Sequence, residues 1–336
     1  MILTEEALTA LVVQVLTRHG LVEPNARIVA GSLVAAERDG AHSHGLLRLE
    51  GYVGTLHSFW VDGAAVPLVT DAAPGLVVTD AANGFAQVAL AASAPLLREK
   101  ARTAGLAALC VSNSHHFGAL WPDIEPFAAD GMIALTAVHA RSRIVVWGGR
   151  RKVLGTNPMA FAFPRRGAPP VIWDQASSRR SQGEVLLARR SGRSVDPGVG
   201  LDAEGRPTTD PGAILDGGAL LPFGDHKGAS IALMVEVLAA ALTGGRFGFE
   251  DRSAAYPGAQ TTNAGQFVLL IDPERSAGTA FGDRIEMLVA QLRATGSERL
   301  PSDARYARRE KSRMEGIRIG DQAYEQIRRL LGVAGS

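Results

Sequence analysis

Cysteine is almost absent from this chain of 336 residues. The one cysteine, Cys110, lies in the apolar run AGLAALCV and has no partner for an intramolecular disulfide. We therefore expect Cys110 to be a small core residue rather than a nucleophile, and the protein to work in a reducing compartment, the cytoplasm. Long hydrophobic runs are lacking too, because Glu236 interrupts the longest run at 229–242. This predicts no membrane span. The first residues carry two glutamates and an amphipathic helical pattern, which is not typical of a signal peptide.

An excess of charge of either sign is also missing, with 35 basic against 34 acidic residues. This balance gives no support for a nucleic-acid partner. Neither G-x-G-x-x-G nor G-x-x-x-x-G-K-[ST] occurs among the 38 glycines, so a bound dinucleotide would need a fold other than the Rossmann fold. The metal motif H-E-x-x-H and cysteine pairs are absent as well. A zinc site built on His42, His44 and His116 with Glu184 or Asp174 remains a weak alternative, and we expect no metal.

Helical patterns occupy the two ends of the chain, and strand-like runs occupy its middle. These runs are GLVVTD, LAALCVSN, MIALTAV, RIVVWG, MAFAFP, VIWDQ and QFVLLID. Few helices between them are long enough to serve as crossovers, which favours antiparallel neighbours. We predict an α+β fold in which residues 1–72 and 284–336 form one helical domain. Residues 73–283 form a cofactor domain around a mostly antiparallel or mixed sheet, with an excursion of loops and turns at 187–224.

The segment RDGAHSHGLLRLEGY, residues 38–52, holds the densest group of candidate site residues. His42, Ser43, His44 and Arg48 place two imidazoles, a hydroxyl and a guanidinium within seven residues. These groups can hold a small carboxylate and pass a proton to it. Asp39-Gly40 ahead of them predicts a break between a helix and a loop.

Four further polar clusters follow along the chain, and each alone has an ordinary structural explanation. They are SNSHHFG after a strand, GTNP in a turn, DQASSRRSQGE, and GDHKG at a helix start. The last two can hold an anion through backbone amides and guanidinium groups. Adjacent histidines point to opposite sides, so we expect at most one of His115 and His116 to face a ligand.

Taken together and in this order, the motifs resemble those of the type-2 malate/lactate dehydrogenases, a non-Rossmann family of nicotinamide-dependent oxidoreductases. They are S-H-G-x-x-R, N-S-x-H-F-G, G-T-N-P, D-x-A-x-S-x-x-x-x-G and G-x-x-K-G. The resemblance runs from about Leu8 to Leu331. The segments RDGAHSHG, NSHHFGALWPDIEPFA and ILDGGALLPFG look most like those of bacterial Δ1-piperideine-2-carboxylate/Δ1-pyrroline-2-carboxylate reductases. These enzymes reduce cyclic ketimines to L-pipecolate or L-proline.

The resemblance implies a homodimer that acts on a small molecule with NADPH, or alternatively with NADH. It assigns proton donation to His44, with Ser43 beside it in a relay and Glu184 at the acidic relay position. Substrate contacts fall to Arg48, Thr156, Gln182 and Gly183. Cofactor contacts fall to His116, Phe117, Gly118, Ala119, Leu120, Asp174, Gln175, Ala176, His226 and Lys227. Protonation of the imine nitrogen favours hydride attack on the imine carbon, so this reaction calls for a proton donor with a pKa near neutrality.

Several positions depart from the pattern of these reductases. Glu184 stands where aspartate is expected, and its extra methylene moves the carboxylate by about 1.5 Å. The other departures are Gln175, Arg179, Arg180, Arg141 and Arg143. Added positive charge at 141 and 143 is compatible with a second acidic group on the substrate, tighter cofactor binding or a lost activity. The alternatives are therefore a 2-oxoacid/2-hydroxyacid dehydrogenase of the same fold, a silent cofactor-binding homologue and a zinc hydrolase.

Overall fold

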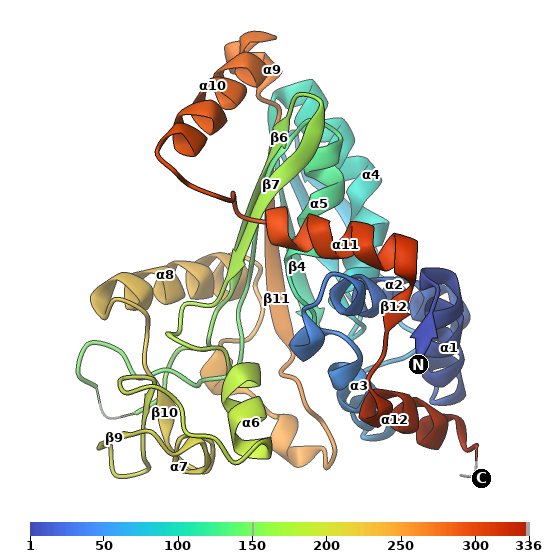
Figure 1. Cartoon of the computed structure of the whole chain (residues 1–336), viewed down its shortest axis with the longest axis vertical. Coiled ribbons are helices and arrows are strands. Elements are labelled where there is room, and N and C mark those ends of the chain that lie inside the picture. Colours follow the sequence, from blue (N-terminus) through green and yellow to red (C-terminus); the bar gives the residue numbers. More distant parts are fainter. Residues whose placement is uncertain (150, 334–336) are drawn as a thin grey trace.

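A seven-stranded mixed sheet forms the centre of the protein in a computed structural model that describes residues 1–149 and 151–333 (Figure 1). The strand order is β2-β3-β4-β11-β5-β6-β7. Strands β3 and β4 pair in parallel, and the other neighbours are antiparallel. The strands are β2 (Leu68–Ala73), β3 (Leu76–Asp80), β4 (Leu106–Ser114), β5 (Ile133–Val138), β6 (Met159–Arg165), β7 (Ala168–Gln175) and β11 (Ala264–Ile271). The predicted mixed, non-Rossmann sheet is confirmed.

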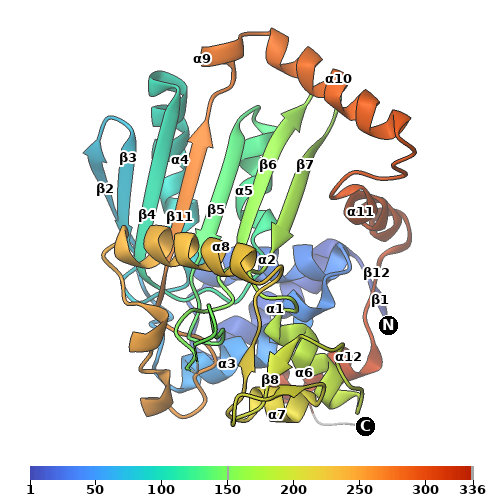
Figure 2. The same cartoon turned by 90° about the vertical axis from the view of Figure 1, so that its left-hand side faces the viewer.

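Helices cover both faces of this sheet, which explains why its central strands are apolar on both sides. On one face lie α4 (Ala86–Ala104) and α5 (Trp121–Ala129), whose Leu97 and Phe127 join the largest core cluster. Helix α8 (His226–Glu236), continued by a π-helical turn at Val237–Ala241, crosses the other face near the strand ends (Figure 2). Cys110 is buried in β4, as predicted.

A helical layer built from both ends of the chain packs below one edge of the sheet (Figure 1). Its helices are α1 (Glu5–Arg18), α2 (Glu23–Arg38), α3 (Leu49–His57) and α12 (Asp321–Leu331). Strand β1 (Ile2–Leu3) pairs antiparallel with β12 (Ile317–Arg318), and α12 packs against α1. The division of the chain into two domains remains our proposal.

The rest of the C-terminal segment links this layer to the sheet. Helix α9 (Glu274–Ala277) follows β11, and α10 (Ala280–Ala294) packs against β6 and β7 through Val289. Helix α11 (Asp303–Glu315) then runs back to the helical layer, and its Arg309 donates hydrogen bonds both to Asp39 of that layer and to Glu125 on α5. Within the described ranges, no helix is long and apolar enough to cross a membrane.

The excursion at 187–224 is more ordered than the sequence predicted. After α6 (Gln182–Arg190), the chain forms α7 (Pro211–Leu215) and a three-stranded sheet. The strands are β8 (Gly200–Leu201), β9 (Pro207–Thr208) and β10 (Ala219–Leu220). Elements this short fall below any detectable periodicity, so the sequence showed only turns.

One strand prediction was wrong, and one strand was missed. RIVVWG forms only isolated bridges at Ile144, because that residue packs into the small core of the excursion with Val185 and Val199. Strand β2 was missed, because it is a mostly exposed edge strand and its sequence LVTDAA is interrupted by Thr70 and Asp71, which leaves no continuous or alternating apolar run.

Candidate active site at one edge of the sheet

The antiparallel register brings distant loops to one edge of the sheet. Strands β4, β5 and β7 end there, and β6 and β11 begin there: Ser114 lies opposite Ala264, and Ala137 and Gln175 both lie opposite Met159. The segments that follow or precede these strand ends line a cavity of about 720 Å³. A cavity of this size at strand ends, facing a second layer, is typical of a ligand site.

Nearly all predicted site residues line this one cavity, although they come from four separate stretches of sequence. They are Ser43, His44, Arg48, His116, Phe117, Gly118, Ala119, Leu120, Thr156, Asp174, Gln175, Ala176, Gln182, Gly183 and Glu184. His226 and Lys227 do not line it.

Ser43, His44 and Arg48 sit on two consecutive 3-10 turns, His42–His44 and Leu46–Arg48. Ser43 Oγ lies 2.9 Å from His44 Nδ1, and Arg48 Nε donates to the Ser43 carbonyl over 2.8 Å. A Cβ at Gly183 would meet Arg48 Nη2 at 3.1 Å. Glycine at 183 therefore lets the start of α6 lie against the guanidinium group.

The charge state of His44 differs from the expectation of a donor near neutrality. Burial, together with the positive charge of Arg48 and the neighbouring His116, lowers the pKa of His44 to about 4. With only the protein's own charged groups around it, the His44 imidazole is therefore neutral at pH 7. His42, in contrast, bonds Glu37: its Nδ1 lies 2.7 Å from Glu37 Oε1.

The Glu184 carboxylate is engaged elsewhere. It accepts a hydrogen bond from the Ser181 amide at 2.8 Å and one from Arg180 at 3.3 Å, and Ser181 Oγ accepts from the Glu184 amide. This is a capping box at the start of α6. Although Glu184 lines the cavity, its carboxylate makes no hydrogen bond to Ser43 or His44 in the described part of the chain. Its relay role remains a prediction.

The two adjacent histidines face opposite sides, as expected. His115 is fully buried, and its Nε2 lies 2.9 Å from Asn83 Oδ1. His116 lines the cavity, and its Nε2 lies 2.9 Å from Asp123 Oδ2, which also accepts from Gln266. Asp123 thus fixes the orientation of the His116 ring.

Asp174 connects β7 to the start of α5 and lies near Trp121 and Arg305, two residues that the motifs did not predict. Its Oδ2 accepts from the Leu120 and Trp121 amides at 2.7 and 3.2 Å. Burial raises the pKa of Asp174, although these bonds and Arg305 oppose the rise. Arg305, on α11, places its guanidinium 4.2 Å from the Trp121 ring centroid, and both residues line the cavity. The segment ARYARREKSR predicts only a solvated helix, so nothing in it distinguished Arg305.

These residues fit a nicotinamide dinucleotide. Arg305 Nη1 and Trp121 Nε1 are buried and lack a hydrogen-bond partner among the described residues. Unpaired buried donors are rare in proteins unless a ligand or water completes them. A guanidinium and an indole N–H beside the start of α5 suit phosphate and amide oxygens.

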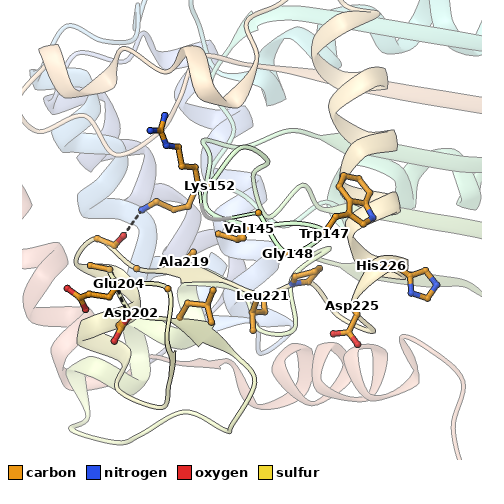
Figure 3. Close-up of a pocket in the computed structure, with 18 residues that line it drawn as sticks. Val145, Trp147, Gly148, Lys152, Asp202, Glu204, Ala219, Leu221, Asp225 and His226 are labelled. Carbon is orange, nitrogen blue, oxygen red and sulfur yellow. Dashed lines mark hydrogen bonds between the residues drawn. The ribbon is translucent and has the colours of Figure 1, made fainter.

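His226 lies on a second cavity of about 1080 Å³, next to the excursion. Figure 3 shows Trp147 and His226 on one side of it and Lys152 on the other. His226 opens α8, as predicted, but Lys227 lines neither of these cavities. The motif GDHKG predicts the position of these residues at a helix start, whereas their distance from the other motifs depends on tertiary packing.

Other side chains line the cavity of about 720 Å³, here called the main cavity, and were either not predicted or noted only as departures from the family pattern. Gln260, Thr261 and Thr262 precede β11 and carry no motif. His139 also lines the cavity, with Arg141 and Arg143. No group of three or more metal-ligating side chains occurs in the part of the chain that the structure describes.

Comparison with known proteins decides the family. The family model described as malate/L-lactate dehydrogenase matches residues 3–328. The chain belongs to this family. The predicted membership is therefore confirmed, and with it the assignment to an oxidoreductase family that uses a nicotinamide cofactor.

Relatives within the family cover nearly the whole chain. A Δ1-pyrroline-2-carboxylate/Δ1-piperideine-2-carboxylate reductase of Pseudomonas putida is 49% identical over 325 residues, which are 97% of this chain and 95% of that protein. A (2R)-3-sulfolactate dehydrogenase (NADP⁺) of Chromohalobacter salexigens is 38% identical over 98% of this chain and 97% of its own length. The crystal structure of Δ1-piperideine-2-carboxylate reductase from Pseudomonas syringae pv. tomato superposes with a TM-score of 0.96 at 48% identity, over 98% of this chain and 99% of that one.

Proposed function

We propose that this protein reduces a cyclic ketimine, of the Δ1-piperideine-2-carboxylate or Δ1-pyrroline-2-carboxylate type, to the corresponding L-imino acid. The observation that carries the proposal is the hydrogen-bonded Ser43–His44 pair beside the Arg48 guanidinium in a cavity lined by the cofactor motifs. The names of the relatives at about half identity support the same chemistry.

Each residue has a definite task in this reaction. A reduced nicotinamide supplies hydride to the imine carbon when bound. Arg48 holds the substrate carboxylate with its guanidinium group, whose Nε is fixed on the Ser43 carbonyl. His44 delivers a proton to the substrate nitrogen, and Ser43 orients the imidazole through Nδ1. The cavity walls exclude water and align the reacting atoms.

Substrate binding itself raises the pKa of His44 and so favours its protonated form. Arg48 contributes to the lowered pKa of His44. A carboxylate bound to Arg48 offsets that positive charge, so the pKa of His44 rises in the complex. Proton donation is therefore coupled to occupation of the carboxylate site.

NADPH is the proposed cofactor, with NADH as the alternative. The unpaired Arg305 Nη1 provides a cation for a phosphate group, and one relative is named for NADP⁺. We also propose the residues at 116–120 and 174–176 as its contacts. A homodimer and a cytoplasmic location complete the proposal, on the basis of the family resemblance and the single cysteine.

A substrate panel tests this function. We expect loss of NADPH absorbance with Δ1-piperideine-2-carboxylate and Δ1-pyrroline-2-carboxylate, and not with pyruvate or oxaloacetate. The reverse pattern would assign the protein to the 2-oxoacid dehydrogenases. NADPH binding without turnover of any substrate would identify a silent homologue, a result to which the engagement of Glu184 in a helix cap would contribute.

His44→Ala should abolish turnover while the Kd for NADPH changes less than about threefold, because the imidazole serves the substrate. In the wild type, we expect a higher pKa in the profile of kcat against pH than in that of kcat/KM, since the bound carboxylate raises the pKa of His44. His42→Ala is the matched control and should keep most of the activity. Turnover by His44→Ala at the wild-type rate would refute the assignment.

A further inference from the structure

The short segment after β5, residues 139–143, concentrates buried side-chain atoms that have no partner. Both ring nitrogens of His139, Nη2 of Arg141 and Nε of Arg143 are buried and lack a hydrogen bond among the described residues. All three side chains line the main cavity. Buried polar atoms in folded proteins are nearly always paired. Four unpaired nitrogens in five residues indicate that a ligand group completes them.

The charge of this segment is poorly balanced. Arg141 Nε approaches Asp251 Oδ2 only to 3.4 Å. Burial and the charge of Arg141 lower the pKa of Arg143 to about 10, and burial together with the charge of Arg143 lowers the pKa of Lys152. One carboxylate thus faces several cations in a partly dehydrated setting. Because an unpaired charge is costly to bury, an incoming anion would stabilise this arrangement.

Backbone contacts place this segment beside the proposed substrate position. The Ala140 amide donates to Asn157 Oδ1 at 3.0 Å, and the Arg143 amide donates to the Leu154 carbonyl at 2.8 Å. The segment therefore flanks the turn that carries Thr156. Arg48 comes from the helical layer instead, against the start of α6. The cavity thus has guanidinium groups on two different walls.

We infer that the substrate carries a second anionic group: a cyclic ketimine dicarboxylate whose first carboxylate binds Arg48 and whose second binds Arg141 and Arg143. This inference rests on the proposed function and narrows its substrate class. A monocarboxylate leaves the second wall unpaired, whereas a ring with a further carboxylate satisfies Nη2 of Arg141 and Nε of Arg143. His139, neutral at pH 7, adds one N–H donor.

Two unreactive planar analogues test the site without requiring turnover. Pyridine-2-carboxylate and pyridine-2,6-dicarboxylate differ by one carboxylate, and their Kd values are measured by calorimetry in metal-free buffer with saturating NADPH. We expect the wild type to bind the dicarboxylate at least 10-fold more tightly, as one charge-assisted contact requires. Arg143→Met and, separately, Arg141→Met should remove this preference and leave the affinity for the monocarboxylate unchanged.

Arg189→Met is the matched control, because Arg189 pairs with Asp216 outside the cavity and its loss changes net charge equally. It should bind both analogues like the wild type. Kinetics then compare kcat/KM for Δ1-piperideine-2,6-dicarboxylate and Δ1-piperideine-2-carboxylate. We expect the dicarboxylate to be favoured at least 10-fold in the wild type and in Arg189→Met, but not in Arg141→Met or Arg143→Met.

Three results would overturn the inference: equal binding of both analogues by the wild type, an equal loss for both in Arg143→Met, or weaker binding of NADPH but not NADH in that variant. The last result would assign the arginines to the cofactor phosphate. Failure of the proposed function gives a different pattern. A retained preference for pyridine-2,6-dicarboxylate without reduction of either ketimine would disprove the reaction and leave the second anion site standing.

Discussion

At the scale of single residues, Arg48 depends on the contacts around it. Its Nε is held by the Ser43 carbonyl, and the absence of a side chain at Gly183 leaves room for Nη2. This arrangement leaves the outer nitrogens of the guanidinium group for the substrate carboxylate. Lysine has one nitrogen, which cannot hold the Ser43 carbonyl and a carboxylate with the same geometry.

Arg48→Lys should therefore raise KM for the ketimine by roughly 10- to 100-fold and change kcat much less, because the lost contact is made in the ground state as well. Steady-state kinetics at fixed NADPH measure both constants. Arg27→Lys, at an exposed arginine paired with Glu23, serves as the control. An unaltered KM would exclude Arg48 from carboxylate binding.

At the scale of elements, Asp174 acts from the end of β7 as a cap for α5. Its carboxylate accepts hydrogen bonds from two amides at the start of that helix, where a negative charge also interacts favourably with the helix dipole.

Asp174→Asn should lower the free energy of unfolding by about 1 kcal/mol and weaken NADPH binding, since the start of α5 lines the cavity. Urea unfolding and fluorescence titration measure the two effects. Asp130→Asn, at an exposed residue paired with Arg98, should change NADPH binding little; wild-type stability and affinity in Asp174→Asn would contradict the capping role.

The elements also show what a sequence can reveal. The run QFVLLI predicted β11 because its five adjacent apolar residues, FVLLI, are typical of a buried strand. The motifs around His44 and His116 likewise predicted residues that line the cavity. Arg305 could not be found, because its helix is polar on all sides and only tertiary packing brings it over Trp121. Glu184 shows the opposite limit. Its position follows from the motif, but the direction of its carboxylate is set by the hydrogen bond that it accepts from the Ser181 amide in the capping box.

At the scale of the whole molecule, three histidines with lowered pKa values link stability to pH: the buried His115 and His139 and the partly exposed His44. Burial lowers the pKa of His44, His115 and His139 to about 4, 3 and 4. Between these values and the ordinary value of 6.5, the unfolded chain binds more protons than the folded one. The free energy of unfolding should therefore fall as the pH drops from about 6.5 towards 4, at roughly 1.4 kcal/mol per pH unit for each histidine.

Urea unfolding followed by tryptophan fluorescence at pH 7, 6 and 5 measures this loss. His115→Gln keeps a donor toward Asn83 but cannot titrate, so its pH dependence should be flatter by about a third. A stability that is constant or increases on acidification to pH 5 would show that these histidines are protonated in the folded protein.

The pairing of β1 with β12 has a consequence for synthesis on the ribosome. The Met1 amino group donates to the Ile319 carbonyl at 3.1 Å, and α1 rests on α12. Strand β1 is therefore translated long before the strand with which it pairs, although domains generally fold as they emerge. Arg305 also reaches the cavity from this late segment. A chain interrupted before α11 would leave the ribosome with an exposed helical layer and an incomplete cavity, so we expect prematurely terminated products to be degraded rather than partly active.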